Sequence, residues 1–374
     1  MPGGGHLHGG SLSDKGASDG HGPAKAAADD MFLAAAILRH AKKEGVLEET
    51  LARLQGEVAG ADIANTPISE EIKSEAHTLE RLTATQFNSL TPENQSKWRE
   101  IAPKRDTFYF DEMDAIVDFA YTNKQRLRGH CLLWHNQNPK WLRDMFEEGA
   151  VTDEELRAVL VRHIFNVVGR YRKYIAQWDV ANEIFNEDGS VREGNPWIDR
   201  FGIEIVADAL KIAHEAAPEC QLYLNDYNVE GINAKSDAYY ELSKKLLADG
   251  VPLHGFGIQG HLALQYGYPH SMRENIARFV DLGLGVEITE LDIRVFVDEN
   301  DEARIPEDLE TQADWYARVI RDALSVPGCT GVTIWGVGDA YSWIPSLFKG
   351  EGAATLFDDN LAPKHAYAAI SAAI

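Results

Sequence analysis

Two short stretches of this 374-residue chain end in side chains suited to acid–base chemistry. The first, AQWDVANE, is an apolar run that closes with Asn182 and Glu183, and the second, GVEITELD, contains Glu290 and Asp292. A single Asn-Glu pair would more simply be a helix N-cap or a loop acid. Because a glutamate at the tip of a buried strand is costly to remove from water, a second stretch of the same kind favours paired catalytic carboxylates.

Polar and aromatic residues also follow the other apolar runs of the chain. Amides, carboxylates and indole rings together are typical of a sugar site, since sugars present hydroxyls to hydrogen-bonding groups and C–H faces to aromatic rings. A glycosidic bond is cleaved by one carboxylic acid that protonates the leaving oxygen and one carboxylate on the opposite side of the sugar. The residues concerned are Glu93, Asn94, Lys97, His130, Trp134, Gln137, Tyr227, Gln259, His261, Trp335 and Trp343.

Other chemistries lack their usual patterns. His130 and His135 lie on one predicted strand, but no acid stands at the spacing of a zinc enzyme, and no Gly-x-Ser-x-Gly elbow occurs. The three cysteines are far apart in the sequence and form neither a disulfide framework nor a zinc site. We therefore expect no metal and no cofactor.

The candidate residues need a scaffold that brings many strand ends together. Eight predicted strands alternate with helical patterns, which indicates an α/β fold of the (β/α)8 TIM-barrel type with an N-terminal extension, whose catalytic groups sit at the C-terminal ends of the strands. A doubly wound open sheet is the alternative, but no Gly-x-Gly-x-x-Gly follows the first strand. The predicted strands are 57–63, 85–90, 126–134, 176–182, 220–226, 254–259, 285–291 and 331–336.

The segment before the first predicted strand divides in two. Residues 1–24 are rich in Gly, Ser, His and Asp and are expected to form a disordered tail. Residues 25–56 are expected to be a helical extension, with apolar positions that include Leu33 and Ile37. Residues 57–374 are then the catalytic domain.

The net charge of the chain disfavours some classes of binding partner. With 36 Lys and Arg against 59 Asp and Glu, the formal net charge is −23, which disfavours nucleic acid and anionic membranes and suits a neutral polymer. No apolar run reaches the ~18 residues of a membrane span. The run Met31–Leu38 follows two aspartates, which is the wrong charge for the start of a signal peptide. We expect a monomer, and the compartment stays open.

From about residue 57 to its end, the chain resembles family 10 glycoside hydrolases, the endo-β-1,4-xylanases. The matching motifs are FNSLTPENQSKW, RGHCLLWHNQ, WDVANE, LYLNDYN, IQGHL, EITELDI and WGVGDAYSW, in family order. The resemblance implies hydrolysis of xylan or xylo-oligosaccharides with retention, through a covalent glycosyl-enzyme intermediate. The family is largely secreted, although no leader is visible here. Retention predicts carboxyl groups ~5–5.5 Å apart, whereas inversion would need ~6.5–9.5 Å.

The resemblance also implies a role for each candidate residue. Glu183 would be the general acid and then the general base, Glu290 the nucleophile, and Asn182 the partner of the sugar 2-hydroxyl, while Asp292 holds His261 and His261 orients Glu290. Trp335 and Trp343 would form the wall and lid of the pocket, with Trp343 excluding the hydroxymethyl group of glucose. Tyr227 would face the leaving group. The non-reducing side would be bound by Glu93, Asn94, Lys97, His130, Trp134, Gln137 and Gln259.

Two other functions stay open from the sequence. One is a related barrel glycosidase, such as a β-1,4-glucanase or an enzyme confined to short xylo-oligosaccharides, which its substrates would reveal. The other is an inactive barrel that only binds sugars or enzymes. That hypothesis predicts the loss of one glutamate, whereas both Glu183 and Glu290 are present.

Overall fold

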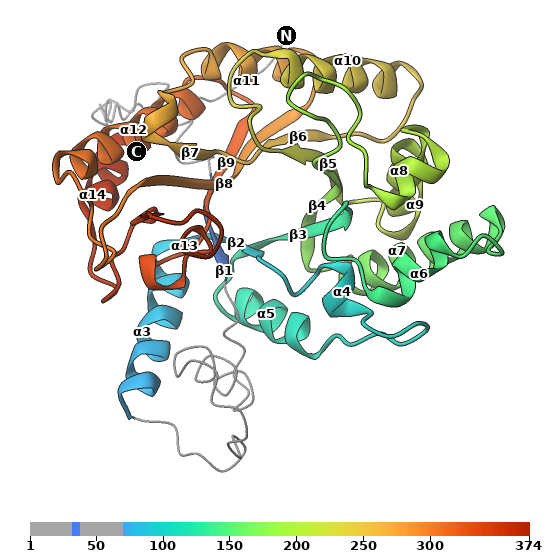
Figure 1. Ribbon diagram of the computed structural model, residues 1–374, viewed down its shortest axis with the longest axis horizontal. Helices are drawn as coiled ribbons and strands as arrows, with labels where there is room; N and C mark the ends of the chain where they lie inside the picture. Colours follow the sequence, from blue (N-terminus) through green and yellow to red (C-terminus); the bar gives the residue numbers. More distant parts are fainter. Residues whose placement is uncertain (1–31, 38–69) are drawn as a thin grey trace, which may run out of the picture.

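Eight parallel strands close into a barrel in the computed structural model, which describes residues 32–37 and 70–374 (Figure 1). Hydrogen bonds join them in the order β1, β2, β3, β4, β5, β6, β8, β9 and back to β1. The predicted (β/α)8 barrel is thus confirmed. The strands are β1 Phe32–Ile37, β2 Ser89–Pro92, β3 Arg126–Leu133, β4 Ile175–Asn182, β5 Gln221–Asp226, β6 Gly255–Ile258, β8 Gly285–Phe296 and β9 Cys329–Ile334, with the short β7 His261–Ala263 and β10 Glu351–Gly352 paired to β8.

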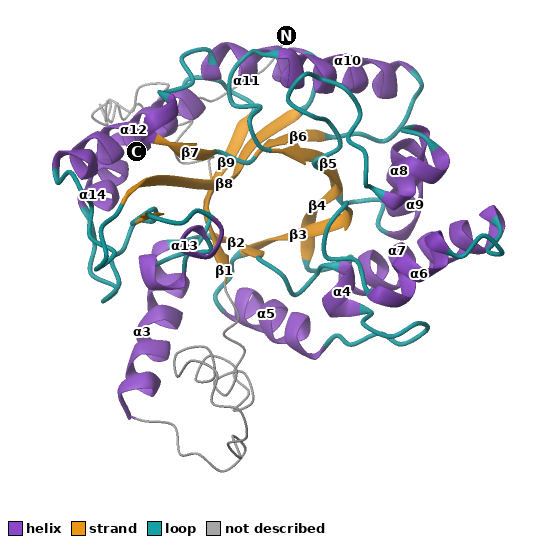
Figure 2. Ribbon diagram, in the orientation of Figure 1, coloured by secondary structure: helices purple, strands orange, loops and turns teal. Residues whose placement is uncertain are grey.

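Helices surround the barrel, as Figure 2 shows. Several begin at a side chain that satisfies free backbone N–H groups: Thr152 and Glu155 form a capping box at α7, and Asn195 caps α8 ahead of Pro196. The helices are α3 Glu70–Gln86, α4 Trp98–Ile101, α5 Asp111–Thr122, α6 Lys140–Glu147, α7 Asp153–Tyr171, α8 Pro196–Phe201, α9 Glu204–Ala216, α10 Ala234–Ala248, α11 Met272–Asp281, α12 Glu307–Leu324, α13 Ile344–Leu347 and α14 His365–Ala373, with 3-10 turns η2 Leu264–Tyr266 and η3 Asp339–Tyr341.

Alternate residues of the strands face opposite sides of the barrel wall. On β4, Trp178 and Val180 are fully buried in the apolar core. Asp179, between them, is held by Arg128 of the neighbouring strand β3. This alternation lets one strand serve both the apolar shell and a polar interior.

The barrel interior below the site is a polar network. Arg128 donates to Glu287 at 3.1 Å and to Asp179, and its guanidinium lies 4.5 Å from the ring centre of Tyr223. Gln177 donates to Glu287 as well. Gly255 on β6 makes room for this layer, since a Cβ there would lie 2.2 Å from the Tyr223 ring. Charge pairing and close packing thus replace the branched apolar side chains that usually fill such barrels.

The N-terminal predictions need correction. The helix predicted over 25–56 is wrong at residues 32–37, which form β1 and close the barrel between β2 and β9. The barrel therefore takes a strand from before residue 57, where the catalytic domain was expected to begin. The predicted tail 1–24 and strand 57–63 lie outside the described residues.

Further along, predicted and observed elements agree more closely. The strand predicted at 85–90 begins too early, because α3 extends to Gln86 and β2 starts at Ser89. Between the predicted strands 176–182 and 220–226, the chain forms two helices, α8 and α9. Within residues 32–37 and 70–374, no helix combines the length and apolar character that crossing a membrane requires.

Candidate active site

Glu183 stands immediately beyond the C-terminal end of β4 in a left-handed backbone conformation, with φ 58°. This conformation is unfavourable for a residue with a side chain, so neighbours must hold it. The Glu183 N–H donates to the Asn225 carbonyl at 2.9 Å, and Arg192 Nε donates to the Glu183 carbonyl at 2.9 Å. The side chain accepts hydrogen bonds from Trp134 Nε1 at 2.9 Å and from Gln259 Nε2 at 3.1 Å.

Glu290 lies on β8 and is 5% exposed. Its Oε1 accepts from Asn225 Nδ2 at 2.9 Å, and its Oε2 is 3.0 Å from His261 Nε2. The other His261 ring nitrogen is 3.0 Å from Asp292 Oδ1. His261 therefore lies between two carboxylates, the arrangement that the resemblance implies.

This arrangement sets the charge of the nucleophile candidate. Burial alone would lower the pKa of His261, but Asp292 and Glu290 raise it to about 10. Burial alone would raise the pKa of the Glu290 carboxyl, but the charge of His130 and the hydrogen bond and charge of His261 hold it below its ordinary value. An ionised Glu290 beside a protonated His261 follows at neutral pH.

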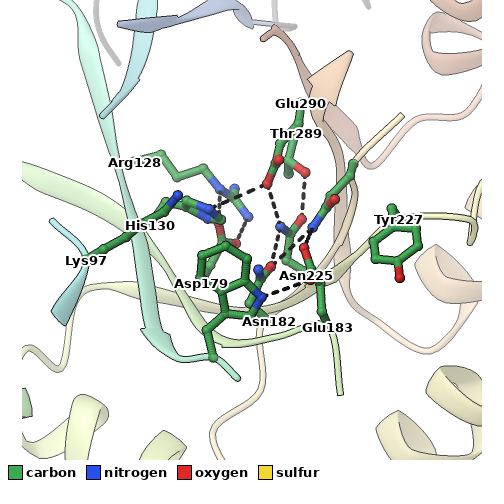
Figure 3. A network of polar contacts seen from close by, with 12 residues as sticks. Lys97, Arg128, His130, Asp179, Asn182, Glu183, Asn225, Tyr227, Thr289 and Glu290 are labelled. Atoms are coloured by element: carbon green, nitrogen blue, oxygen red, sulfur yellow. Dashed lines mark hydrogen bonds and ion pairs between the residues drawn. The ribbon is translucent and has the colours of Figure 1, made fainter. Parts of the chain in front are cut away.

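Three amides link the two carboxyl groups (Figure 3). Gln259, which donates to Glu183, is 3.3 Å from the amide of Asn182, and Asn225 Nδ2 lies 2.9 Å from that same amide and from Glu290. The structure thus brings Glu183 and Glu290 together at one end of the barrel, although they come from β4 and β8.

A set of polar residues after β2 and β3 lies beside Glu183. Lys97 and Gln137 both donate to Asn94 Oδ1 at 3.2 Å. The Lys97 ammonium is 4.8 Å from the ring centre of Trp134, which donates to Glu183. Glu93 is buried next to Asn94 at the end of β2. Five of the residues predicted to bind the non-reducing side therefore lie together: Glu93, Asn94, Lys97, Trp134 and Gln137.

The two predicted wall and lid tryptophans lie around the histidines. Trp343 Nε1 donates to Asp292 Oδ2 at 2.8 Å, and its ring centre is 4.8 Å from that of His261. Trp335 meets His130 edge to face at 5.5 Å and is 5% exposed. Asp292 thus fixes both His261 and the Trp343 indole.

Tyr227 stands apart, beyond the end of β5. Its hydroxyl accepts from Arg192 Nη2 at 2.8 Å. The ring borders a pocket of about 480 Å³, which is otherwise lined by Asn186, Glu187, Asp188 and Arg192. This open side lies next to the segment that follows Glu183.

Sequence reasoning assigned no role to several residues of the network. Asn225 touches Glu290 and Asn182 and is fixed by Thr289, which donates to its Oδ1 at 2.6 Å. Asp179 Oδ2 lies 2.9 Å from His130 Nδ1, and His135 Nδ1 lies 3.9 Å from Glu183 Oε2. The available signal was spacing, because polar residues two positions apart on one strand face the same side.

Among residues 32–37 and 70–374, no group of three or more His, Cys, Asp or Glu side chains is arranged to hold a metal ion. The site instead brings together paired carboxylates with hydrogen-bond donors and indoles around them.

The sequence of the chain is similar to those of known proteins. The family model "Glycosyl hydrolase family 10" matches residues 49–373. An endo-1,4-beta-xylanase of Agaricus bisporus is 40% identical over 284 residues, covering 76% of this chain and 82% of that protein. A beta-1,4-xylanase of Dictyoglomus thermophilum is 42% identical over 296 residues, covering 77% and 82%.

Solved structures agree in fold. Native xylanase 10B from Thermotoga maritima superposes with a TM-score of 0.79 at 34% identity, covering 92% of this chain and 94% of that one. Xylanase 10B from Thermotoga petrophila RKU-1 in complex with xylobiose gives a TM-score of 0.79 at 33% identity, covering 99% and 98%.

Proposed function

The chain belongs to glycosyl hydrolase family 10 and is a retaining endo-1,4-β-xylanase, and we propose that Glu290 and Glu183 carry out its two displacements. One observation supports this assignment above the others. Glu290 is 3.0 Å from His261, which also contacts Asp292, whereas the described residues that donate to the Glu183 side chain, Trp134 and Gln259, are neutral. The two carboxyl groups therefore have different environments, as a nucleophile and an acid–base residue require.

In the first step, a Glu290 oxygen bonds to the anomeric carbon while the bond to the leaving oxygen breaks. The proton of the Glu183 carboxyl passes to that oxygen, so the leaving sugar departs as an alcohol. The Asn225 and His261 hydrogen bonds aim Glu290 and supply its negative charge with partners. Glu183 becomes a carboxylate.

In the second step, water attacks the anomeric carbon and the bond to Glu290 breaks. Glu183 takes the proton from the water and returns to its acid form. The donors Trp134 Nε1 and Gln259 Nε2 suit this carboxylate form. We expect carboxyl groups about 5–5.5 Å apart, the separation of retaining glycosidases.

The remaining residues bind the chain of sugars. In this proposal Asn182 holds the 2-hydroxyl at the point of cleavage, and the cluster of Asn94, Lys97 and Gln137 binds the non-reducing side. Tyr227 takes the leaving-group side. Xylo-oligosaccharides are the proposed ligands, supported by the neighbour that was solved with xylobiose.

Product analysis tests the function. On xylohexaose, the first product that proton NMR detects is expected to be the β-anomer, which then mutarotates, because two displacements restore the configuration. Xylan should be cleaved in preference to carboxymethyl-cellulose. An α-anomer formed first would contradict the double displacement, and cleavage of carboxymethyl-cellulose without xylan would favour the glucanase alternative.

Trp343 is expected to set the preference for xylose over glucose. Its indole is fixed by Asp292 and packed on His261, so it cannot easily move away from a hydroxymethyl group. Trp343→Ala should raise the ratio of kcat/KM for an aryl cellobioside over an aryl xylobioside by roughly tenfold, within the range for fitting one small group. Trp315→Ala, a buried tryptophan of α12 that packs on Tyr268, is the control, and an unchanged ratio in Trp343→Ala would remove Trp343 from this role.

A further inference from the structure

A lysine with no exposed surface lies against the tyrosine of the leaving-group side. Lys235, in the first turn of α10, has a side-chain exposure of 0%. Its Nζ lies 3.0 Å from Asp226 Oδ1, 3.1 Å from Glu187 Oε1 and 3.6 Å from the ring centre of Tyr227. A buried ammonium is costly unless its donors are used, and here all three directions are occupied.

Hydrogen bonds connect Asp226, and through it Lys235, to the segment that contains Glu183. Its Oδ1 accepts from the Tyr227 N–H at 2.7 Å, and its Oδ2 accepts from the Tyr239 hydroxyl at 2.6 Å. The Tyr239 hydroxyl in turn accepts from the N–H of Ile184 at 3.0 Å, the residue after Glu183. The ammonium is therefore two side chains away from the strained backbone that presents Glu183.

Glu187, the second acid bound by Lys235, lies in the loop that borders the pocket. It lies on the segment after β4 that is closed by a bridge between Phe185 and Val191. Its Oε2 accepts from Asn228 Nδ2 at 3.1 Å, while its Oε1 meets Lys235. One ammonium thus ties together this loop, the end of β5 and the start of α10.

We propose that Lys235 is a positioning residue for the leaving-group side of the cleft, where it fixes the Tyr227 ring and the Glu187 loop as one surface for a departing xylose unit. The inference rests on the proposed function. A desolvated ammonium on an aromatic face is a strong interaction that fixes both ring position and tilt. The pocket bordered by Tyr227 and Glu187 is the space that such a sugar would occupy.

Lys235→Met separates positioning from a merely structural role, since methionine fills a similar volume without the charge. Xylohexaose places sugars on both sides of the cut, whereas p-nitrophenyl β-xylobioside places none on the leaving-group side. We expect kcat/KM for xylohexaose to fall by roughly tenfold or more, mainly through an increase in KM. Only xylohexaose has sugar units on the leaving-group side, so only this substrate loses the binding interactions made there. The aryl xylobioside should keep its kcat/KM within about twofold.

The matched control is Lys244→Met, an exposed lysine on the same helix. Glu187→Gln is the second variant, because Glu187 is largely exposed and its change leaves the Lys235–Asp226 pair intact. Glu187→Gln should lower kcat/KM for xylohexaose by a smaller factor and leave kcat/KM for the aryl xylobioside unchanged. If thermal unfolding shows that Lys235→Met is not properly folded, the result for Glu187→Gln tests the proposal. Equal losses on both substrates, or no loss on xylohexaose, would overturn the proposal. A wild-type protein that cleaves neither substrate would instead overturn the proposed function.

Discussion

Alanine at Glu183 and alanine at Glu290 are each expected to lower xylan cleavage by about four to six orders of magnitude, the scale seen when one member of a catalytic set is removed. The reasons differ between the two variants. Without Glu290 no glycosyl-enzyme forms, and without Glu183 an alcohol must leave unprotonated. Steady-state rates on xylohexaose measure both losses.

Azide distinguishes the two roles, because it is a small nucleophile that needs no general base. With a dinitrophenyl xylobioside, whose leaving group needs no proton, Glu183→Ala should still form the intermediate, and azide should release it as the β-xylobiosyl azide. In Glu290→Ala the azide can only occupy the place of the lost carboxylate and give the α-product. Exchanged stereochemistry would reverse the assignment. Glu193→Ala, an exposed acid near the same loop, should behave as wild type.

The two carboxylates of the site could be predicted from the sequence because they lie at the ends of strands. WDVANE and EITELD each put a carboxylate directly after or within an apolar run, and parallel strands carry such residues to one face of a barrel. The contacts of His261 with Asp292 and Glu290 were implied by the resemblance to family 10 glycoside hydrolases, not by spacing, since His261 lies far from both acids in the sequence. Their hydrogen bonds confirm this placement.

The first barrel strand could not be read in the same way. Its sequence, FLAAAI, is a short apolar run rich in alanine, a strong helix former, and has no turn signal beside it. When both faces of a strand are lined by apolar residues, its sequence shows no alternation, so periodicity cannot separate it from a buried helix. Its identity comes from pairing with β2 and β9, which are distant in sequence.

Buried charges were missed for a related reason. Lys235 lies in an ordinary helical pattern, where a lysine is nearly always solvated, and only the fold places Asp226 and Tyr227 against it. Arg128 stands two residues before His130 on β3, so its inward direction was predictable from spacing. Its partners were not, since Asp179 and Glu287 come from other strands.

Arg128→Met is expected to destabilise the fold by about 3–5 kcal/mol, the usual result of removing one partner from a buried ion pair. Arg128 is 1% exposed and compensates two buried carboxylates, Asp179 and Glu287. For a barrel of this size the loss should lower Tm by about 5–8 °C. Arg157→Met is the control, because its ion pair with Asp208 is exposed and should contribute at most ~1 kcal/mol.

The acid dependence of this loss identifies its cause. Burial would raise the pKa of Asp179, but the charge of Arg128 and the bond to His130 hold it below its ordinary value of 3.8. Asp179 therefore adds stability that is present above that value and is lost as pH falls through its lowered pKa. The variant has less of this stability to lose, so its Tm should approach that of the wild type as pH falls below about 4.

A second substitution tests whether uncompensated charge, rather than lost packing, explains the effect. Glu287→Gln in the Arg128→Met background removes one of the two carboxylates that lose their Arg128 partner and should recover roughly 1–2 kcal/mol, measured as a double-mutant cycle from thermal unfolding. In the wild-type background the same change takes a partner from Arg128 and should destabilise. A recovery in both backgrounds, or in neither, would mean that the loss of the Arg128 charge does not explain the destabilisation.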